Sequence, residues 1–294
     1  MTIASINGID LYYEEHGDAA APPLLLIMGF TMNAAAWASQ IPALSERYRV
    51  IAFDNRGAGR TTQPEGAYSI TQMADDAAGL LDHLGIASAH IVGASMGGMI
   101  AQEFALRYPA RVRGLVLACT TAGGPHSAGY DEMMAQSEEG MAVTDLVAAM
   151  TPDRIKENMD LMFTADFQAH PGPGLMQIAA AALQYPQTLA GMKGQLEAIR
   201  AHDTYDRLPQ IAAPTLVIAG DADMLVDARN SPLLAQRIPG AKLVMFPGLK
   251  HGFTAEKPDE VNAAILGFLT QVDAHATPPA RRPLLARIFG RGAA

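Results

Sequence analysis

Short apolar runs bounded by turn-forming residues alternate along this chain with segments of helical periodicity, and this alternation most constrains the fold. The apolar runs are Leu24–Met28, Val50–Phe53, His90–Val92, Leu115–Cys119, Thr215–Ala219 and Leu243–Phe246, and the helical segments lie near 34–46, 70–84, 96–107, 229–238 and 258–272. Most of the runs are too apolar to have a face in water, which is typical of parallel strands covered by helices on both sides. Two more strands, at 2–6 and 9–15, are joined by Asn7-Gly8, a strong hairpin signal. The sequence predicts an α/β fold with a mostly parallel, eight-stranded sheet flanked by helices.

Composition narrows the classes of function. The 294 residues are 49% apolar and 17% charged, which is enough apolar surface for a sizeable core. The net charge of −9 is unlike that of a nucleic-acid binder. The single cysteine, Cys119, allows neither an intramolecular disulfide nor a cysteine-cluster metal site. The first residues lack the basic and apolar regions of a secretory signal, and no apolar stretch near them is long enough to span a bilayer. We therefore expect a soluble, cytoplasmic globular protein. Its expected partner is a small-molecule substrate, and it is expected to be a monomer or homodimer.

The interval from Gly124 to Leu208 interrupts the alternation, because it has helical periodicity but no convincing strand. It contains eight of the 16 methionines, and 12 acidic against five basic residues, a net charge of −7. We expect residues 124–208 to be a helical cap inserted into a core made of 1–123 and 209–272. The tail, 273–294, is proline-rich at its start and carries four arginines. A loosely ordered terminus is the favoured interpretation, with a basic anchor that associates weakly with a membrane surface as the alternative.

The segment IVGASMGG at 91–98 carries the sharpest functional signal. A strand run ends at Gly93, Ser95 follows, and a helical pattern begins at Met96, so the pattern G-x-S-x-G lies in a strand–turn–helix context. The serine of such a turn has a strained backbone, and the glycines leave room for the closely packed strand and helix. Ser95 is therefore the candidate nucleophile, with an idle serine in a glycine-rich turn as the alternative.

A nucleophilic serine needs a base that is oriented by an acid. His251 follows the final strand run, and Asp221 and Asp223 directly follow the run at 215–219. Both positions are at carboxyl ends of strands, where open α/β sheets gather their catalytic groups. We expect His251 to be the base. Asp223 is favoured over Asp221 as the acid because it lies further into its loop, while Asp221 can hold the loop in shape through backbone amides.

A tetrahedral intermediate also needs two hydrogen-bond donors for its oxyanion. The backbone N–H of Met96, directly after the candidate nucleophile, is one expected donor, and the N–H of Phe30 is the other. Gly29 allows the backbone before Phe30 to approach closely.

The segments LLLIMGFTMNAAAW, FDNRGAGRTTQP, GASMGG, GDADMLVD and GLKHGF together resemble those of α/β-hydrolase-fold serine hydrolases, over about residues 5–272. The chain is most similar to the group that contains 3-oxoadipate enol-lactonases and aclacinomycin-methylesterase-like enzymes. The resemblance implies the α/β-hydrolase fold and a triad of Ser95, Asp223 and His251. Many members have His-Gly at the oxyanion loop where this chain has Met28-Gly29, which favours the methylesterase-like branch.

The turn DNRGAGRT at 54–61 admits two interpretations. Arg56 can reach an anionic substrate, but we favour a structural role in which Asp54 and Arg56 tie the turn together.

The function expected from these residues is hydrolysis of a carboxylic ester or lactone of a small, apolar or aromatic substrate through an acyl-enzyme, without a cofactor or metal. The alternatives with the same triad are a C–C bond hydrolase, an acyltransferase and a perhydrolase. A non-catalytic binding protein would be expected to have a damaged triad. A dehalogenase would need a carboxylate at position 95, and no His/Asp cluster has the spacing of metal ligands.

Overall fold

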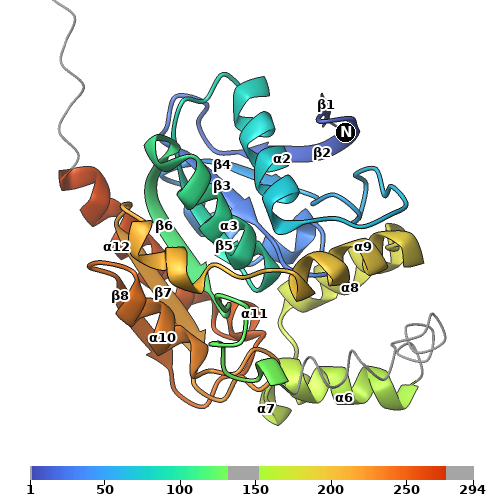
Figure 1. The fold of residues 1–294 in the computed structure, drawn as a ribbon. Helices are drawn as coiled ribbons and strands as arrows, with labels where there is room; N and C mark the ends of the chain where they lie inside the picture. The colour runs from blue at the N-terminus through green and yellow to red at the C-terminus, as the bar shows by residue number, and fades with distance from the viewer. Residues whose placement is uncertain (1, 132–151, 276–294) are drawn as a thin grey trace, which may run out of the picture.

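One twisted sheet with helices on both sides makes up most of the structure (Figure 1). The computed structural model describes residues 2–131 and 152–275. The strand order is β1-β2-β4-β3-β5-β6-β7-β8, and β2 alone runs against the other strands. The strands are β1 (Thr2–Ile6), β2 (Ile9–His16), β3 (Pro23–Ile27), β4 (Arg49–Phe53), β5 (Ala89–Ala94), β6 (Val112–Ala118), β7 (Thr215–Gly220) and β8 (Lys242–Phe246). The expected fold class is therefore confirmed.

The hairpin between β1 and β2 forms as its turn residues predict. Asn7 and Gly8 both have positive φ, at 48° and 78°, and Ile6 pairs with Ile9 across the turn. Two consecutive residues with positive φ match the twist of antiparallel strands, which is why Asn-Gly favours this turn.

Helices cover both faces of the sheet, and alternate residues of each strand point to opposite faces. Leu25 and Ile27 of β3 pack toward α2 (Ile70–His83), α3 (Met96–Arg107) and α10 (Asn230–Arg237). Leu24 and Leu26 pack toward the 3-10 helix η1 (Ala34–Trp37), α1 (Ile41–Leu44) and α12 (Pro258–His275). Both faces of these central strands are therefore buried, as parallel strands require.

Three local expectations differ from the structure. The helix expected at 34–46 is divided into η1 and α1, because Pro42 lacks an N–H and is accommodated only in the first turn of a helix. Strand β8 forms the edge of the sheet, and Leu243 and Val244 are 39% and 37% exposed, so this run is not covered on both faces. Helix α12 continues to His275, past the expected boundary at 272, and residues 276–294 lie outside the described residues.

The described parts of 124–208 are helical, with no strand longer than a single bridge. They contain α6 (Pro152–Met162), α7 (Ala165–Ala169), α8 (Pro173–Gln184), α9 (Leu189–Arg200) and the 3-10 helix η3 (Tyr205–Gln210). One antiparallel bridge joins Gly123, directly before this segment, to Asp203 near its end. Four of its eight methionines, at 133, 134, 141 and 150, lie outside the described residues.

Among the described residues, no helix is both long enough and apolar enough to cross a membrane.

Candidate active site

Ser95 lies at the sharp turn between β5 and α3, at the carboxyl edge of the sheet. Its backbone has φ 56° and ψ −123°, a strained conformation for a residue other than glycine. Neighbouring bonds hold it there: Ser95 N–H donates to the carbonyl of Ala118 at 2.9 Å, and the Thr120 hydroxyl donates to the Ser95 carbonyl at 2.7 Å. The serine predicted from the G-x-S-x-G pattern thus occupies the strained turn that the pattern implies.

Glycines make this turn possible by removing side chains where backbones meet. A Cβ on Gly93 would come within 2.3 Å of the Gly97 carbonyl oxygen, and one on Gly97 would come within 2.0 Å of the Ile27 oxygen. A Cβ on Gly29 would lie 2.9 Å from the Ser95 Cβ. The end of β3 and the turn after β5 are therefore in direct contact, as the sequence predicts for Gly29.

Asp223 and His251 form a buried pair at the same edge of the sheet. The His251 Nδ1 lies 2.7 Å from the Asp223 Oδ2, and the two residues are 4% and 6% exposed. The other carboxylate oxygen, Oδ1, accepts the N–H groups of Leu225 and Val226 at 2.9 and 3.0 Å. These amides fix the carboxylate, so that one oxygen remains for the imidazole.

Asp221 does not contact the histidine ring. Its Oδ1 accepts the N–H of Gly248 at 2.6 Å, which ties the loop after β7 to the loop after β8. Gly220 brings these loops close, because a Cβ there would lie 2.1 Å from the Leu249 carbonyl oxygen. The geometry matches the loop-shaping role that was the alternative for Asp221.

The structure brings Asp223 and His251 together, but within the described chain Ser95 makes no hydrogen bond to His251. Hydrogen bonds between catalytic groups are often long in a protein without substrate and tighten when substrate binds.

The two expected oxyanion donors flank Ser95 from different elements. Phe30 follows Gly29 after β3, and its N–H has no acceptor among the residues that the structure describes. Met96 is the first residue of α3, and the first amides of a helix have no carbonyl one turn before them. Both N–H groups are therefore free to bind a ligand oxygen.

Cys119 lies directly after β6 and is buried. Burial raises the pKa of its thiol well above the usual range, and the charge of Asp223 acts in the same direction. The thiol therefore stays neutral and does not compete with the serine hydroxyl.

The two residues expected to hold the turn at 54–61 bind different partners. Arg56 forms a two-pronged ion pair with Asp76 of α2, with both nitrogen–oxygen distances at 2.8 Å. Asp54 binds Arg60 within the turn, at 2.8 Å. The structural interpretation of Arg56 holds, but its partner lies 20 positions away on a helix that the turn sequence does not specify.

The sequence did not indicate how residues of α6 and α9 contact this site. Gln195 of α9 accepts the N–H of Thr31, directly after Phe30, at 3.0 Å. At the end of α6, the Met162 carbonyl accepts the N–H of Gly252, directly after His251, at 2.7 Å. An uncharged Gln within a helical segment has no sequence pattern that indicates its contact with another loop. A backbone carbonyl has no such pattern either, because every residue carries one.

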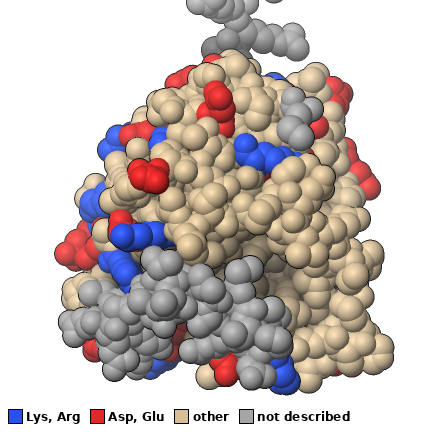
Figure 2. Space-filling view, turned by 90° about the vertical axis from the view of Figure 1, so that its right-hand side faces the viewer, with Lys and Arg blue, Asp and Glu red and all other residues tan. Residues whose placement is uncertain are grey.

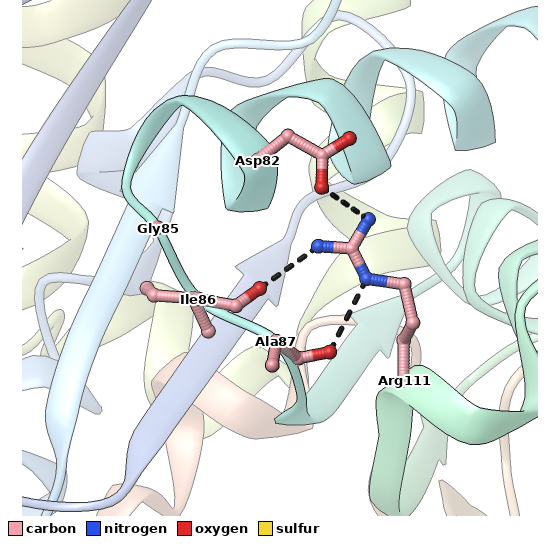
Figure 3. A pocket seen from close by; sticks show the side chains of 5 residues that line it. All are labelled: Asp82, Gly85, Ile86, Ala87 and Arg111. Atoms are coloured by element: carbon pink, nitrogen blue, oxygen red, sulfur yellow. Dashed lines mark hydrogen bonds and ion pairs between the residues drawn. The ribbon is translucent and has the colours of Figure 1, made fainter. Parts of the chain in front are cut away.

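A surface hollow lined by Arg111 lies at the opposite edge of the sheet (Figure 3). Its other lining residues, Asp82, Gly85, Ile86 and Ala87, lie between the end of α2 and the start of β5. The Arg111 guanidinium binds Asp82 at 2.8 Å and the Ile86 carbonyl at 2.8 Å, so it caps the end of α2. This hollow is a helix-capping site and is remote from Ser95.

Within residues 2–131 and 152–275, no group of three or more His, Cys, Asp or Glu side chains is arranged to hold a metal ion.

Comparison with known proteins agrees with this architecture. The family model described as the alpha/beta hydrolase fold matches residues 22–258. A protein named carbamate hydrolase RutD from Azorhizobium caulinodans is 34% identical over 93% of this chain and 100% of its own length. The structure of an enol-lactonase from Burkholderia xenovorans is 30% identical, with a TM-score of 0.75 over 92% of this chain and 100% of that one. A thermophilic esterase from Thermogutta terrifontis is 29% identical, with a TM-score of 0.78 over 92% of this chain and 98% of that one. The chain belongs to the alpha/beta hydrolase fold family and is similar to hydrolases along nearly all of its length.

Proposed function

We propose that this chain is a serine hydrolase in which Ser95 is the nucleophile, His251 the general base and Asp223 the residue that orients it. The observation that carries the proposal is the buried 2.7 Å contact between Asp223 and His251, at the sheet edge where Ser95 occupies a strained turn. The backbone N–H groups of Phe30 and Met96 are the proposed oxyanion donors.

In the proposed reaction, the Ser95 hydroxyl attacks the acyl carbon while His251 Nε2 accepts its proton. Asp223 holds the ring through Nδ1 and stabilises the imidazolium. The oxyanion is bound by the two N–H groups, and the leaving group takes the proton from His251 as the acyl-enzyme forms. Water, deprotonated by His251, then releases the acid and restores the serine.

The substrate that fits best is a small, uncharged ester or lactone with an apolar or aromatic acyl part. Arg56 and Arg60 are both committed to carboxylates and are not available to bind an anion. Residues 171–192, which include α8, contain no Lys, Arg, Asp or Glu. The face at the right of Figure 1, where α8 and α9 lie, has a broad area without charged side chains (Figure 2). We propose that 124–208 forms a cap over the site and favours neutral, apolar substrates.

A carbamate is the second candidate substrate class, and the named carbamate hydrolase relatives favour it. The carbonyl carbon of a carbamate is open to the same attack, which would place a carbamoyl group on Ser95.

A panel of p-nitrophenyl esters of graded acyl length, with a p-nitrophenyl carbamate added, tests the proposal on the wild type and Ser95→Ala. We expect turnover of short or aromatic esters by the wild type and loss of that turnover in Ser95→Ala. Faster turnover of the carbamate than of every ester would favour the second candidate. Full activity in Ser95→Ala would contradict both.

A further inference from the structure

The loop that carries the proposed oxyanion donor Phe30 contains a strained turn. The N–H of Met32 donates to the Gly29 carbonyl at 3.3 Å, and Thr31, in the third position of this turn, has φ 64°. Glycine or asparagine usually occupies such a position. For a β-branched residue a positive φ is an outlier that persists only where surrounding contacts hold it. The position of the Phe30 N–H therefore depends on whatever holds Thr31.

The side chain that holds Thr31 is Gln195 of α9. Gln195 is fully buried, and its Oε1 accepts the Thr31 N–H at 3.0 Å. Its Nε2 donates to the Arg56 carbonyl at 2.8 Å, and Gln187 Nε2 donates to the same Oε1 at 2.9 Å. A donor on one side and a carbonyl on the other fix which way the Gln195 amide faces. Both ends of the amide are thus anchored, which suits it to fix the oxyanion loop.

Two glycines of α9 allow Gln195 to reach this loop. A Cβ on Gly191 would lie 2.3 Å from the Gly57 carbonyl oxygen, and a Cβ on Gly194 would lie 2.7 Å from the Tyr68 ring. The helix therefore lies directly against the turn at 54–61 and the Tyr68 ring, and its next residue, Gln195, points to the oxyanion loop.

We infer that Gln195 is a positioning residue, which holds Thr31 in its strained conformation and so aims the Phe30 N–H at the oxyanion. This inference rests on the proposed function and deepens it, because it makes a residue far from the triad in sequence necessary for fast acyl transfer. Without Gln195, Thr31 relaxes toward negative φ and the Phe30–Thr31 peptide rotates. The adjoining Gly29–Phe30 peptide, which carries the Phe30 N–H, then shifts with it. Ground-state binding of the ester depends little on this N–H, whereas the tetrahedral state depends on it strongly.

A double-mutant cycle with Thr31→Gly tests the inference, because glycine adopts positive φ without strain. Both substitutions are made alone and together, and Gln236→Ala, an exposed glutamine in α10 and outside residues 124–208, is the control. Rates for a p-nitrophenyl ester are normalised to the fraction of chains labelled by a fluorophosphonate. We expect Gln195→Ala to lower kcat about 10- to 100-fold with KM nearly unchanged. In the Thr31→Gly background, the same substitution should lower kcat by less than about fivefold.

Each outcome decides between the inference and a simpler role. Equal losses from Gln195→Ala in both backgrounds would mean that Gln195 only supports the fold, and an unchanged kcat would remove it from the mechanism. Either result leaves the proposed function intact as long as the wild type is labelled and active. If the wild type is neither labelled nor active on any ester or carbamate, the proposed function itself fails.

Discussion

The contact between Gly29 and the turn at Ser95 makes a sharp prediction for Gly29→Ala. An added Cβ would lie 2.9 Å from the Ser95 Cβ, 3.1 Å from the Ala94 carbonyl oxygen and 3.3 Å from the Ser95 Oγ. Non-bonded carbon atoms pack at about 3.5–4.0 Å, so the Ser95 side chain and the end of β3 must separate by about 0.6–1 Å.

This displacement falls on the reacting atoms themselves, since it moves Ser95 relative to the Phe30 N–H. A misplacement of about 1 Å costs on the order of 100-fold in rate. We therefore expect Gly29→Ala to lower kcat/KM about 10- to 100-fold, while overpacking lowers the free energy of unfolding by about 1–3 kcal/mol.

Steady-state hydrolysis of a p-nitrophenyl ester and urea unfolding would measure the two effects. Gly267→Ala is the matched control, because a Cβ at that position in α12 would meet no atom within 4 Å. It should keep full activity and gain up to about 1 kcal/mol from its better helix propensity. Wild-type kcat/KM in Gly29→Ala would refute the close packing of the oxyanion loop against Ser95.

Three further predictions follow from individual contacts. Asp223→Asn should lower kcat about 1,000- to 10,000-fold because the ring loses its orienting carboxylate, whereas Asp221→Asn should stay within about threefold. A larger loss from Asp221→Asn than from Asp223→Asn would reverse the assignment. Burial lowers the pKa of His202 to about 3 in the folded chain. As the pH falls from about 6.5 to 3, the His202 imidazole is therefore protonated in the unfolded chain but stays neutral in the folded one. Stability is therefore lost on acidification there, by about 1.4 kcal/mol per pH unit in the middle of the window; urea unfolding of His202→Gln should show a shallower loss than the wild type, and an identical slope would count against it. Glu256 accepts hydrogen bonds from the N–H and the hydroxyl of Thr164, so Glu256→Ala should lower the free energy of unfolding by about 1–3 kcal/mol in the same assay, and no change would argue against this link between α11 (Phe253–Glu256) and α7.

Local sequence signals were sufficient for most of the fold. The apolar runs, the Asn7-Gly8 turn and the G-x-S-x-G segment each express a constraint that acts over a few residues, and the structure contains all three. The exposure of Leu243 and Val244 could not be predicted from the sequence, because an edge strand can have the same apolar pattern as a central strand. Which strand lies at the edge is a property of topology.

The candidate site also combines features that local sequence patterns predict with contacts between distant residues that they do not. Asp223 and His251 are candidates from the sequence because each follows a recognisable strand, and the structure adds that their side chains lie 2.7 Å apart. The partner of Arg56 and the contact of Gln195 with Thr31 could not be predicted. These pairs join positions 20 and 164 residues apart, and nothing near either partner specifies the other.

Covalent labelling tests the central claim, the nucleophilic role of Ser95, most directly. The wild type, Ser95→Ala and His251→Ala would each be treated with diisopropyl fluorophosphate, digested and examined by mass spectrometry. We predict one adduct per chain, on the peptide that contains Ser95, absent from Ser95→Ala and formed far more slowly in His251→Ala. An adduct on another residue, or ester hydrolysis by Ser95→Ala at the wild-type rate, would contradict the account.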